Sequence, residues 1–123
     1  MTQEDKELLL KDLCARLPYH CRVFYEYVDD LDGKTYGYSL TLNTWCINEF
    51  NANKAVIKPY LRPMSSMTEE EIKEYKHLIA FSGNPIGSAD FIDWLNSHHF
   101  DYRNLIENGL AIEVTEKNNP YKE

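Results

Sequence analysis

The chain has 123 residues, a net charge of −7 and 43% hydrophobic residues, which fits one folded domain with a hydrophobic core, so the chain need not be disordered. No apolar run approaches the ~18 residues of a membrane span, and the polar start Thr2–Glu7 is unlike a signal peptide, so no membrane partner is expected. The three cysteines, at no recognised spacing, favour free thiols and a cytoplasmic location.

A helix is predicted at the start of the chain. Thr2 and Asp5 have the spacing of a weak capping box, and Pro18 ends the helical pattern. Between them, apolar residues recur at helical spacing and form one face: Leu9, Leu10, Leu13, Cys14 and Leu17.

A β-rich part follows this helix within residues 1–62. The stretch Arg22–Val28 and the alternating stretch Tyr36–Leu42 flank the pair Asp32–Gly33, which is typical of a β-hairpin with a tight turn. A third strand is predicted over Ala55–Leu61, with its proline at an edge or a bulge. The asparagines within Trp45–Asn53 indicate a turn between these strands.

Helices are predicted in the next part, residues 63–115. Thr68 and Glu71 form the clearest capping box of the chain. Four apolar residues then recur as a stripe: Ile72, Tyr75, Leu78 and Ile79. The composition of Ser82–Gly87 indicates a loop, and Ser88 is expected to cap another helix with Phe91, Ile92 and Leu95 on its buried side.

The end of the chain predicts smaller elements. Asp101 is expected to cap a short helical turn, Leu110–Thr115 alternates as a short last strand, and residues 116–123 read as a polar tail. The whole pattern predicts an α+β fold in a single domain, residues 1–123. Its parts are an N-terminal helix, a small bent antiparallel sheet that is either open or barrel-like, and C-terminal helices with the short last strand.

Three stretches of the chain carry a family resemblance: Leu8–Tyr19, Ile57–Glu71 and Asp93–Arg103. Together they resemble a group of short uncharacterised proteins of gut Bacteroidales that are associated with phages or mobile elements. The resemblance covers the two ends of the chain better than the hairpin. It implies an accessory role in a mobile element, and it transfers no activity and no functional residue.

Neither a catalytic nor a metal-binding set is evident. His98 and His99 are adjacent and would point about 100° apart on a helix, whereas ligands on one helix face are three or four residues apart. The cysteines near His20 lack a fourth zinc ligand, and the calcium-loop-like run Asp29–Gly33 lacks oxygen ligands at the first and last loop positions. We therefore predict a protein that is not an enzyme and that uses no metal or cofactor.

Acidic residues are concentrated late in the chain. Residues 63–123 carry five Lys or Arg against eleven Asp or Glu, a net charge of −6, whereas residues 1–62 carry eight against nine, a net charge of −1. This imbalance predicts a surface that steers a basic protein partner: Glu70, Glu74, Asp90, Asp93 and Trp94. The simpler alternative is dispersed charge on a solvated surface.

A second candidate surface lies in the β-rich part. Its tyrosine and basic residues would form a face for single-stranded nucleic acid: Tyr25, Tyr27, Tyr36, Tyr38, Arg22, Lys34, Lys54, Lys58 and Arg62. Nearby carboxylates, including Glu26, weaken that field, so nucleic acid is not the favoured partner. The sequence thus favours a small non-catalytic protein-binding accessory factor of a mobile element, with a small nucleic-acid-binding module as the alternative. It specifies neither the partner nor the oligomeric state.

Overall fold

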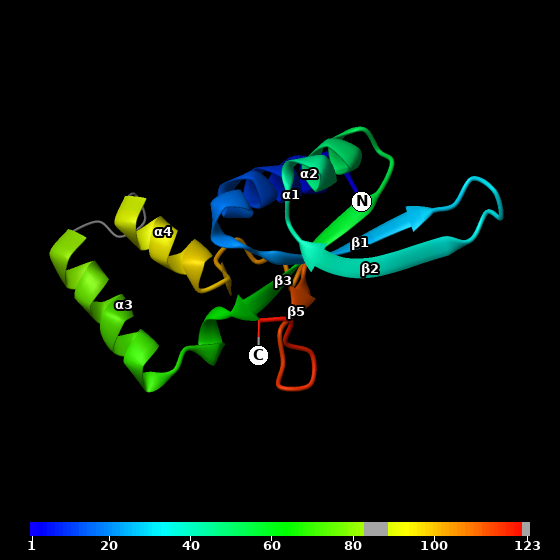
Figure 1. Ribbon diagram of the computed structural model, residues 1–123. Coiled ribbons are helices and arrows are strands. Elements are labelled where there is room, and N and C mark those ends of the chain that lie inside the picture. Colours follow the sequence, from blue (N-terminus) through cyan, green and yellow to red (C-terminus); the bar gives the residue numbers. More distant parts are fainter. Residues whose placement is uncertain (83–88, 122–123) are drawn as a thin grey trace.

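The computed structural model describes residues 1–82 and 89–121 (Figure 1). Its helices are α1 (Gln3–Arg16), α2 (Thr44–Asn51), α3 (Glu69–Ser82) and α4 (Ala89–Ser97), and single 3-10 turns follow α1 and β3. Its strands are β1 (Arg22–Val28), β2 (Thr35–Thr41), β3 (Val56–Pro63), β4 (Phe100–Asp101) and β5 (Ile112–Glu113). The predicted α+β class is confirmed.

The strands form one open sheet in the order β2-β1-β3-β4, with β5 also paired to β3. The long strands pair antiparallel, as predicted, whereas β4 and β5 each add two residues parallel to β3. The barrel-like alternative is wrong, because among the described strands β2 pairs with β1 alone and never meets the short strands that would close the ring. Pro59 lies opposite Val23 of β1, and on its other side β3 meets β5 only from Tyr60 onward, so the proline is at a locally unpaired edge, as predicted.

Helix α1 lies with α2 over one face of the sheet (Figure 1). The Asp5 N–H donates to Thr2 Oγ1 at 3.0 Å and the Thr2 N–H donates to the Asp5 carboxylate at 3.2 Å, which confirms the predicted capping box. Leu9 and Leu13 are buried as predicted, but Cys14 is exposed. Cys14 directly follows Leu13 in the chain and therefore projects to a different side of α1, away from the sheet. The buried face of the helix is thus narrower than expected.

Helix α2 occupies the segment where a turn was predicted. The Cys46 N–H donates to the Asn43 side chain at 2.9 Å, so this asparagine caps a helix. Cys46 and Phe50, four residues apart on the same side of α2, are both buried. The prediction of a turn over Trp45–Asn53 is therefore wrong for the helical residues up to Asn51, and a turn is found only at Ala52–Asn53, where the helix ends.

Two hydrophobic clusters fill the fold. The sheet core lies between the sheet and its covering helices and contains these buried residues: Leu9, Leu13, Cys21, Val23, Tyr25, Leu42, Cys46, Phe50, Ala55, Ile57, Leu61, Leu105, Leu110 and Ala111. The helical-pair core lies around α3 and α4 and contains the buried residues Phe91, Leu95 and Phe100.

The start of α3 is as predicted. The Thr68 N–H donates to the Glu71 carboxylate at 2.9 Å, and the Glu71 N–H donates to Thr68 Oγ1 at 3.2 Å. Most of the predicted stripe packs on the helical-pair core, but Ile72, in the first turn of α3, is 39% exposed. Ser82, the first residue of the predicted loop Ser82–Gly87, is instead the last residue of α3. The rest of that loop and the cap at Ser88 lie outside the described residues.

The C-terminal segment is held by side-chain contacts. The Asp101 carboxylate accepts the N–H groups of Leu105 and Ile106, each at 3.0 Å, so the predicted cap forms over a series of turns rather than a regular helix. The expected polar tail is anchored at Tyr121. Its hydroxyl donates to the Tyr60 carbonyl at 2.7 Å and accepts the Arg22 N–H at 2.9 Å.

Candidate binding surface

Four tyrosines share one face of the β1–β2 hairpin. The antiparallel register places Tyr25 opposite Tyr38 and Tyr27 opposite Tyr36, and opposite residues of paired strands project to the same side. The ring centroids are 5.4 Å apart in the first pair and 6.0 Å apart in the second. Tyr25 and Tyr27 also lie 5.8 Å apart along β1, so the rings form a continuous group.

Trp45 extends this group onto α2. The cap at Asn43 places Trp45 in the first turn of the helix, directly after the chain leaves β2. Its ring stacks on Tyr25 with centroids 5.0 Å apart and planes at 24°. We call the five side chains the aromatic face: Tyr25, Tyr27, Tyr36, Tyr38 and Trp45.

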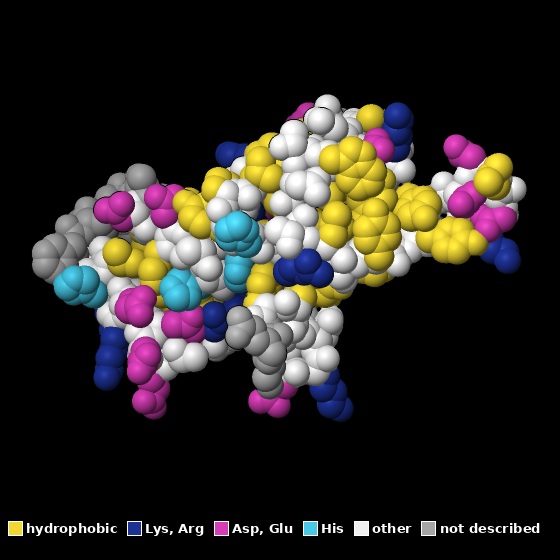
Figure 2. Space-filling view, viewed as in Figure 1, with side chains coloured by type: hydrophobic (Ala, Val, Ile, Leu, Met, Phe, Trp, Pro, Cys, Tyr) yellow, Lys and Arg dark blue, Asp and Glu magenta, His cyan; other side chains and the backbone are white. Residues whose placement is uncertain are grey.

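The aromatic face is buried at its base and open along its length. Tyr25 is 5% exposed, whereas Tyr36, Tyr38 and Trp45 are 42%, 44% and 48% exposed. Figure 2 shows hydrophobic side chains gathered over the start of α2 and along the hairpin, with acidic side chains at its tip. Three half-exposed aromatic rings in one group are characteristic of surfaces that bind a partner.

Strand β2 also forms a free edge of the sheet. It pairs with β1 on one side, and no described strand pairs with its other side. All its residues except Leu40 are exposed, and it contains no charged residue and no proline. Such residues are the usual protection of an edge strand against pairing with another chain, so this edge is unprotected.

The electrostatic surroundings of the aromatic face are negative. Residues 23–50 carry five acidic residues and one lysine, a net charge of −4. Tyr36 donates a hydrogen bond to Asp32, which raises the pKa of the tyrosine and lowers that of the carboxyl group. Burial, followed by the charge of Glu49, raises the pKa of Tyr25. Tyr25 and Tyr36 are therefore neutral at physiological pH, and the field around the aromatic face attracts cations.

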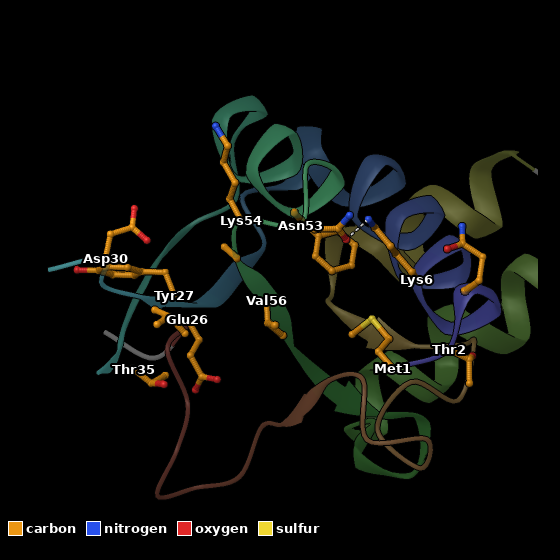
Figure 3. Close-up of a pocket in the computed structure, with 14 residues that line it drawn as sticks. Met1, Thr2, Lys6, Glu26, Tyr27, Asp30, Thr35, Asn53, Lys54 and Val56 are labelled. Atoms are coloured by element: carbon orange, nitrogen blue, oxygen red, sulfur yellow. Dashed lines mark hydrogen bonds between the residues drawn. The ribbon is translucent and has the colours of Figure 1, made fainter. Parts of the chain in front are cut away.

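A surface hollow of about 830 Å³ adjoins the aromatic face at Tyr27. It lies where β1 extends past β3, between the hairpin and the start of α1 (Figure 3). Lys6 donates to the side chain of Asn53 at 2.5 Å at one end, while Tyr27 and Glu26 enter from β1 at the other (Figure 3). The hollow mixes lysines with carboxylates and converges on no single charge, so we treat it as an extension of the aromatic face.

The structure separates the residues of the predicted nucleic-acid face. Tyr25 and Tyr36 share the aromatic face, but Lys58 lies opposite Phe24 and therefore on the other side of the sheet. Arg62 forms a two-pronged ion pair with Glu71, at 2.8 and 2.7 Å. The expected combination of tyrosines and free basic side chains is thus not assembled.

The predicted acidic surface is also divided. Glu74 accepts the indole N–H of Trp94 at 2.8 Å, and Asp93 accepts the hydroxyl of Tyr19 at 2.5 Å. The Trp94 ring is half-buried and stacks on Phe100 in the helical-pair core. Glu70 and Asp90 are exposed on separate helices.

Sequence reasoning placed the four tyrosines in one candidate surface but missed Trp45, the fifth member of the aromatic face. Tyr27 and Tyr38 follow from strand alternation, whereas Trp45 required the prediction of α2. Within residues 1–82 and 89–121, no group of His, Cys, Asp and Glu is arranged to hold a metal ion. No helix in the same ranges has the length and apolar character needed to cross a membrane.

Comparisons with known proteins add no relative. No family model matches the chain, and neither curated proteins nor solved structures give a significant match. The residues of the aromatic face and the edge strand beside it are therefore the features from which a function can be inferred.

Proposed function

We propose that this protein is a non-catalytic protein-binding module and that the aromatic face is its working surface. The observation that carries the proposal is the continuous group of Trp45, Tyr38 and Tyr36, each more than two-fifths exposed. Tyrosine and tryptophan are enriched at the centres of protein interfaces, because each buries a large ring and keeps a polar group for hydrogen bonding.

The charge around the aromatic face supports a protein partner over nucleic acid. The net charge of −4 on residues 23–50 repels a phosphate backbone, and Lys58 projects from the opposite side of the sheet. Rings can still stack on bases, so gel shift with single- and double-stranded oligonucleotides at two salt concentrations is the direct check. We expect no shift at either concentration.

The setting of this module is also a proposal. A role as an accessory factor of a mobile element is supported by the resemblance to proteins of gut Bacteroidales, and by no feature of the aromatic face. A cytoplasmic location stays a prediction from the cysteine pattern, and Cys21 and Cys46 are buried free thiols.

Affinity capture from cells of the source organism, followed by calorimetry with the purified partner, tests the proposal. The variant Trp45→Ala with Tyr36→Ala should weaken binding by at least about tenfold, because truncated interface aromatics commonly cost more than that factor. The matched control is Glu70→Lys with Asp90→Lys, which alters the exposed acidic side chains of α3 and α4. Binding lost in the control and kept in the aromatic variant would move the working surface to the helical pair.

A further inference from the structure

The free edge of β2 presents a regular row of backbone donors and acceptors. The Leu42 N–H donates to the Cys21 carbonyl at 2.8 Å, and the Asp29 N–H donates to the Lys34 carbonyl at 2.9 Å. Hydrogen-bonded and non-bonded pairs alternate along an antiparallel ladder, so the even-numbered residues of β2 bond to β1. The backbone groups of the intervening residues point away from the sheet: Thr35, Gly37, Ser39 and Thr41.

This edge is held straight from the side opposite the aromatic face. The register between β1 and β2 runs from Arg22↔Thr41 to Val28↔Thr35 without a bulge. The Phe24 ring covers Gly37 so closely that a Cβ atom there would lie 2.4 Å from it, and the Ser39 and Tyr60 hydroxyls are 2.8 Å apart. A pre-ordered edge loses little conformational entropy when another strand pairs with it.

Building on the proposed function, we propose that the partner docks by adding an extended, basic segment to β2. Alternate side chains of an added strand would lie beside Tyr36 and Tyr38, within the field of Asp32 and Glu49. Arginine and lysine suit that position, because the cation is attracted by the ring faces and by the carboxylates. The other side chains would lie beside small uncharged residues, where threonine or valine fits the pleat.

Charge argues against a second copy of this chain at the same edge. In an antiparallel pairing of two β2 strands, each hairpin tip would approach the other copy's α2, which follows β2 directly in the chain. The tip carries Asp29, Asp30 and Asp32, and Glu49 lies on α2. Like charges would therefore meet at both ends of the pairing, whereas a basic segment meets opposite charge there.

Selection from a displayed library of random peptides of about ten residues tests this docking mode, since strand addition needs only a short extended segment. We expect enriched peptides with arginine or lysine at alternate positions. Adding one of them should slow amide hydrogen exchange at Gly37, Ser39 and Thr41. Enrichment of acidic or helical peptides, no enrichment, or unchanged exchange at these amides would overturn the proposal.

A matched pair of variants separates the edge from the side chains. Ser39→Pro removes one outward N–H, and Ser39→Ala removes the same hydroxyl but keeps that N–H. Ser39→Pro should lower the binding affinity for the enriched peptide roughly tenfold relative to Ser39→Ala, which is about the effect of one lost hydrogen bond. If Ser39→Pro does not fold, the double variant Asp32→Asn with Glu49→Gln tests the proposal instead, and it should lower the affinity for the enriched peptide. Unchanged affinity would contradict recognition of a basic segment.

The same variants distinguish failure of this inference from failure of the proposed function. A captured protein that depends on Trp45 and Tyr36 but is indifferent to Ser39→Pro would keep the aromatic face as the binding surface and overturn strand addition. Sedimentation could instead show a dimer that is absent in Ser39→Pro and that no enriched peptide dissociates. That result would assign the edge to a second copy of the chain and overturn the proposal of a basic partner.

Discussion

The sheet core and the helical-pair core differ in how completely they are covered. Among the described residues, fourteen are buried in the sheet core and three in the helical-pair core, where most contributing side chains are only partly covered. Helix α1 packs against α2 and α4 as well as on the sheet, whereas α3 has α4 as its main neighbour. An apolar stripe thus predicts which side of a helix turns inward, while the number of neighbouring elements sets how much of it is buried.

Two polar joints connect these cores. At the first, the buried carboxylate of Asp12 binds Arg16 at 2.7 Å and Arg103 at 2.8 Å, and Arg16 also donates to the backbone of β4 at 2.7 Å. At the second, Arg62 of β3 binds Glu71 of α3. Because the helical-pair core buries little apolar surface, we expect these joints to hold it to the sheet.

Breaking the first joint should have the largest effect. Asp12→Ala is expected to lower the free energy of unfolding by roughly 4 kcal/mol, because it leaves the fully buried Arg16 guanidinium without its carboxylate. Arg103→Ala removes a partly exposed partner and should cost about 1 kcal/mol. Urea denaturation followed by circular dichroism measures both, with exposed Glu7→Ala as the control. Equal losses for Asp12→Ala and Arg103→Ala would contradict the buried-charge explanation.

A matched pair of leucines compares the two cores directly. Leu13 is 0% exposed in the sheet core and Leu95 is 1% exposed in the helical-pair core. Leu13→Ala should cost roughly 3 kcal/mol, and Leu95→Ala roughly 2 kcal/mol, because the partly covered side chains around Leu95 can move into the space. Both variants should shift a single unfolding transition. Its fluorescence can be followed from Trp45 alone in a Trp94→Phe background and from Trp94 alone in a Trp45→Phe background. Separate transitions would show that residues 1–123 do not fold as one domain.

The second joint should produce a smaller effect that depends on pH. The hydrogen bonds from Arg62 lower the pKa of Glu71 from 4.5 to about 2. The carboxylate therefore stabilises the fold above about pH 4.5, and this contribution is lost as the pH falls towards 2. Glu71→Gln should cost roughly 2 kcal/mol at pH 7 and progressively less on acidification. Glu70→Gln, at the preceding exposed position, is the control, and a cost that is constant from pH 7 to pH 3 would exclude this role for Glu71.

Features that depend on nearby residues were predictable from the sequence. The capping boxes at Thr2 and Thr68 join residues three positions apart, and the hairpin strands follow from alternation within a few residues. The same alternation places Tyr25 and Tyr36 on one side, so part of the aromatic face was within reach of sequence reasoning. Patterns of this kind involve residues that are close together in the chain, so they can be recognised without knowledge of the packed fold.

Features that depend on distant residues required the assembled fold. Lys58 lies on the far side of the sheet because of the register between β3 and β1, and Trp45 joins the aromatic face because α2 lies beside Tyr25. Arg16 is fully buried despite its charge, because the carboxylate of Asp12 and the backbone of β4 meet it there. Tyr121 is held in place, although it lies in the expected polar tail, because its hydroxyl bonds to the Tyr60 carbonyl and the Arg22 N–H, which are both far away in the chain. Burial of a polar side chain is favourable only when such a partner is already in place, and local sequence patterns contain no information about partners that only the packed elements bring together.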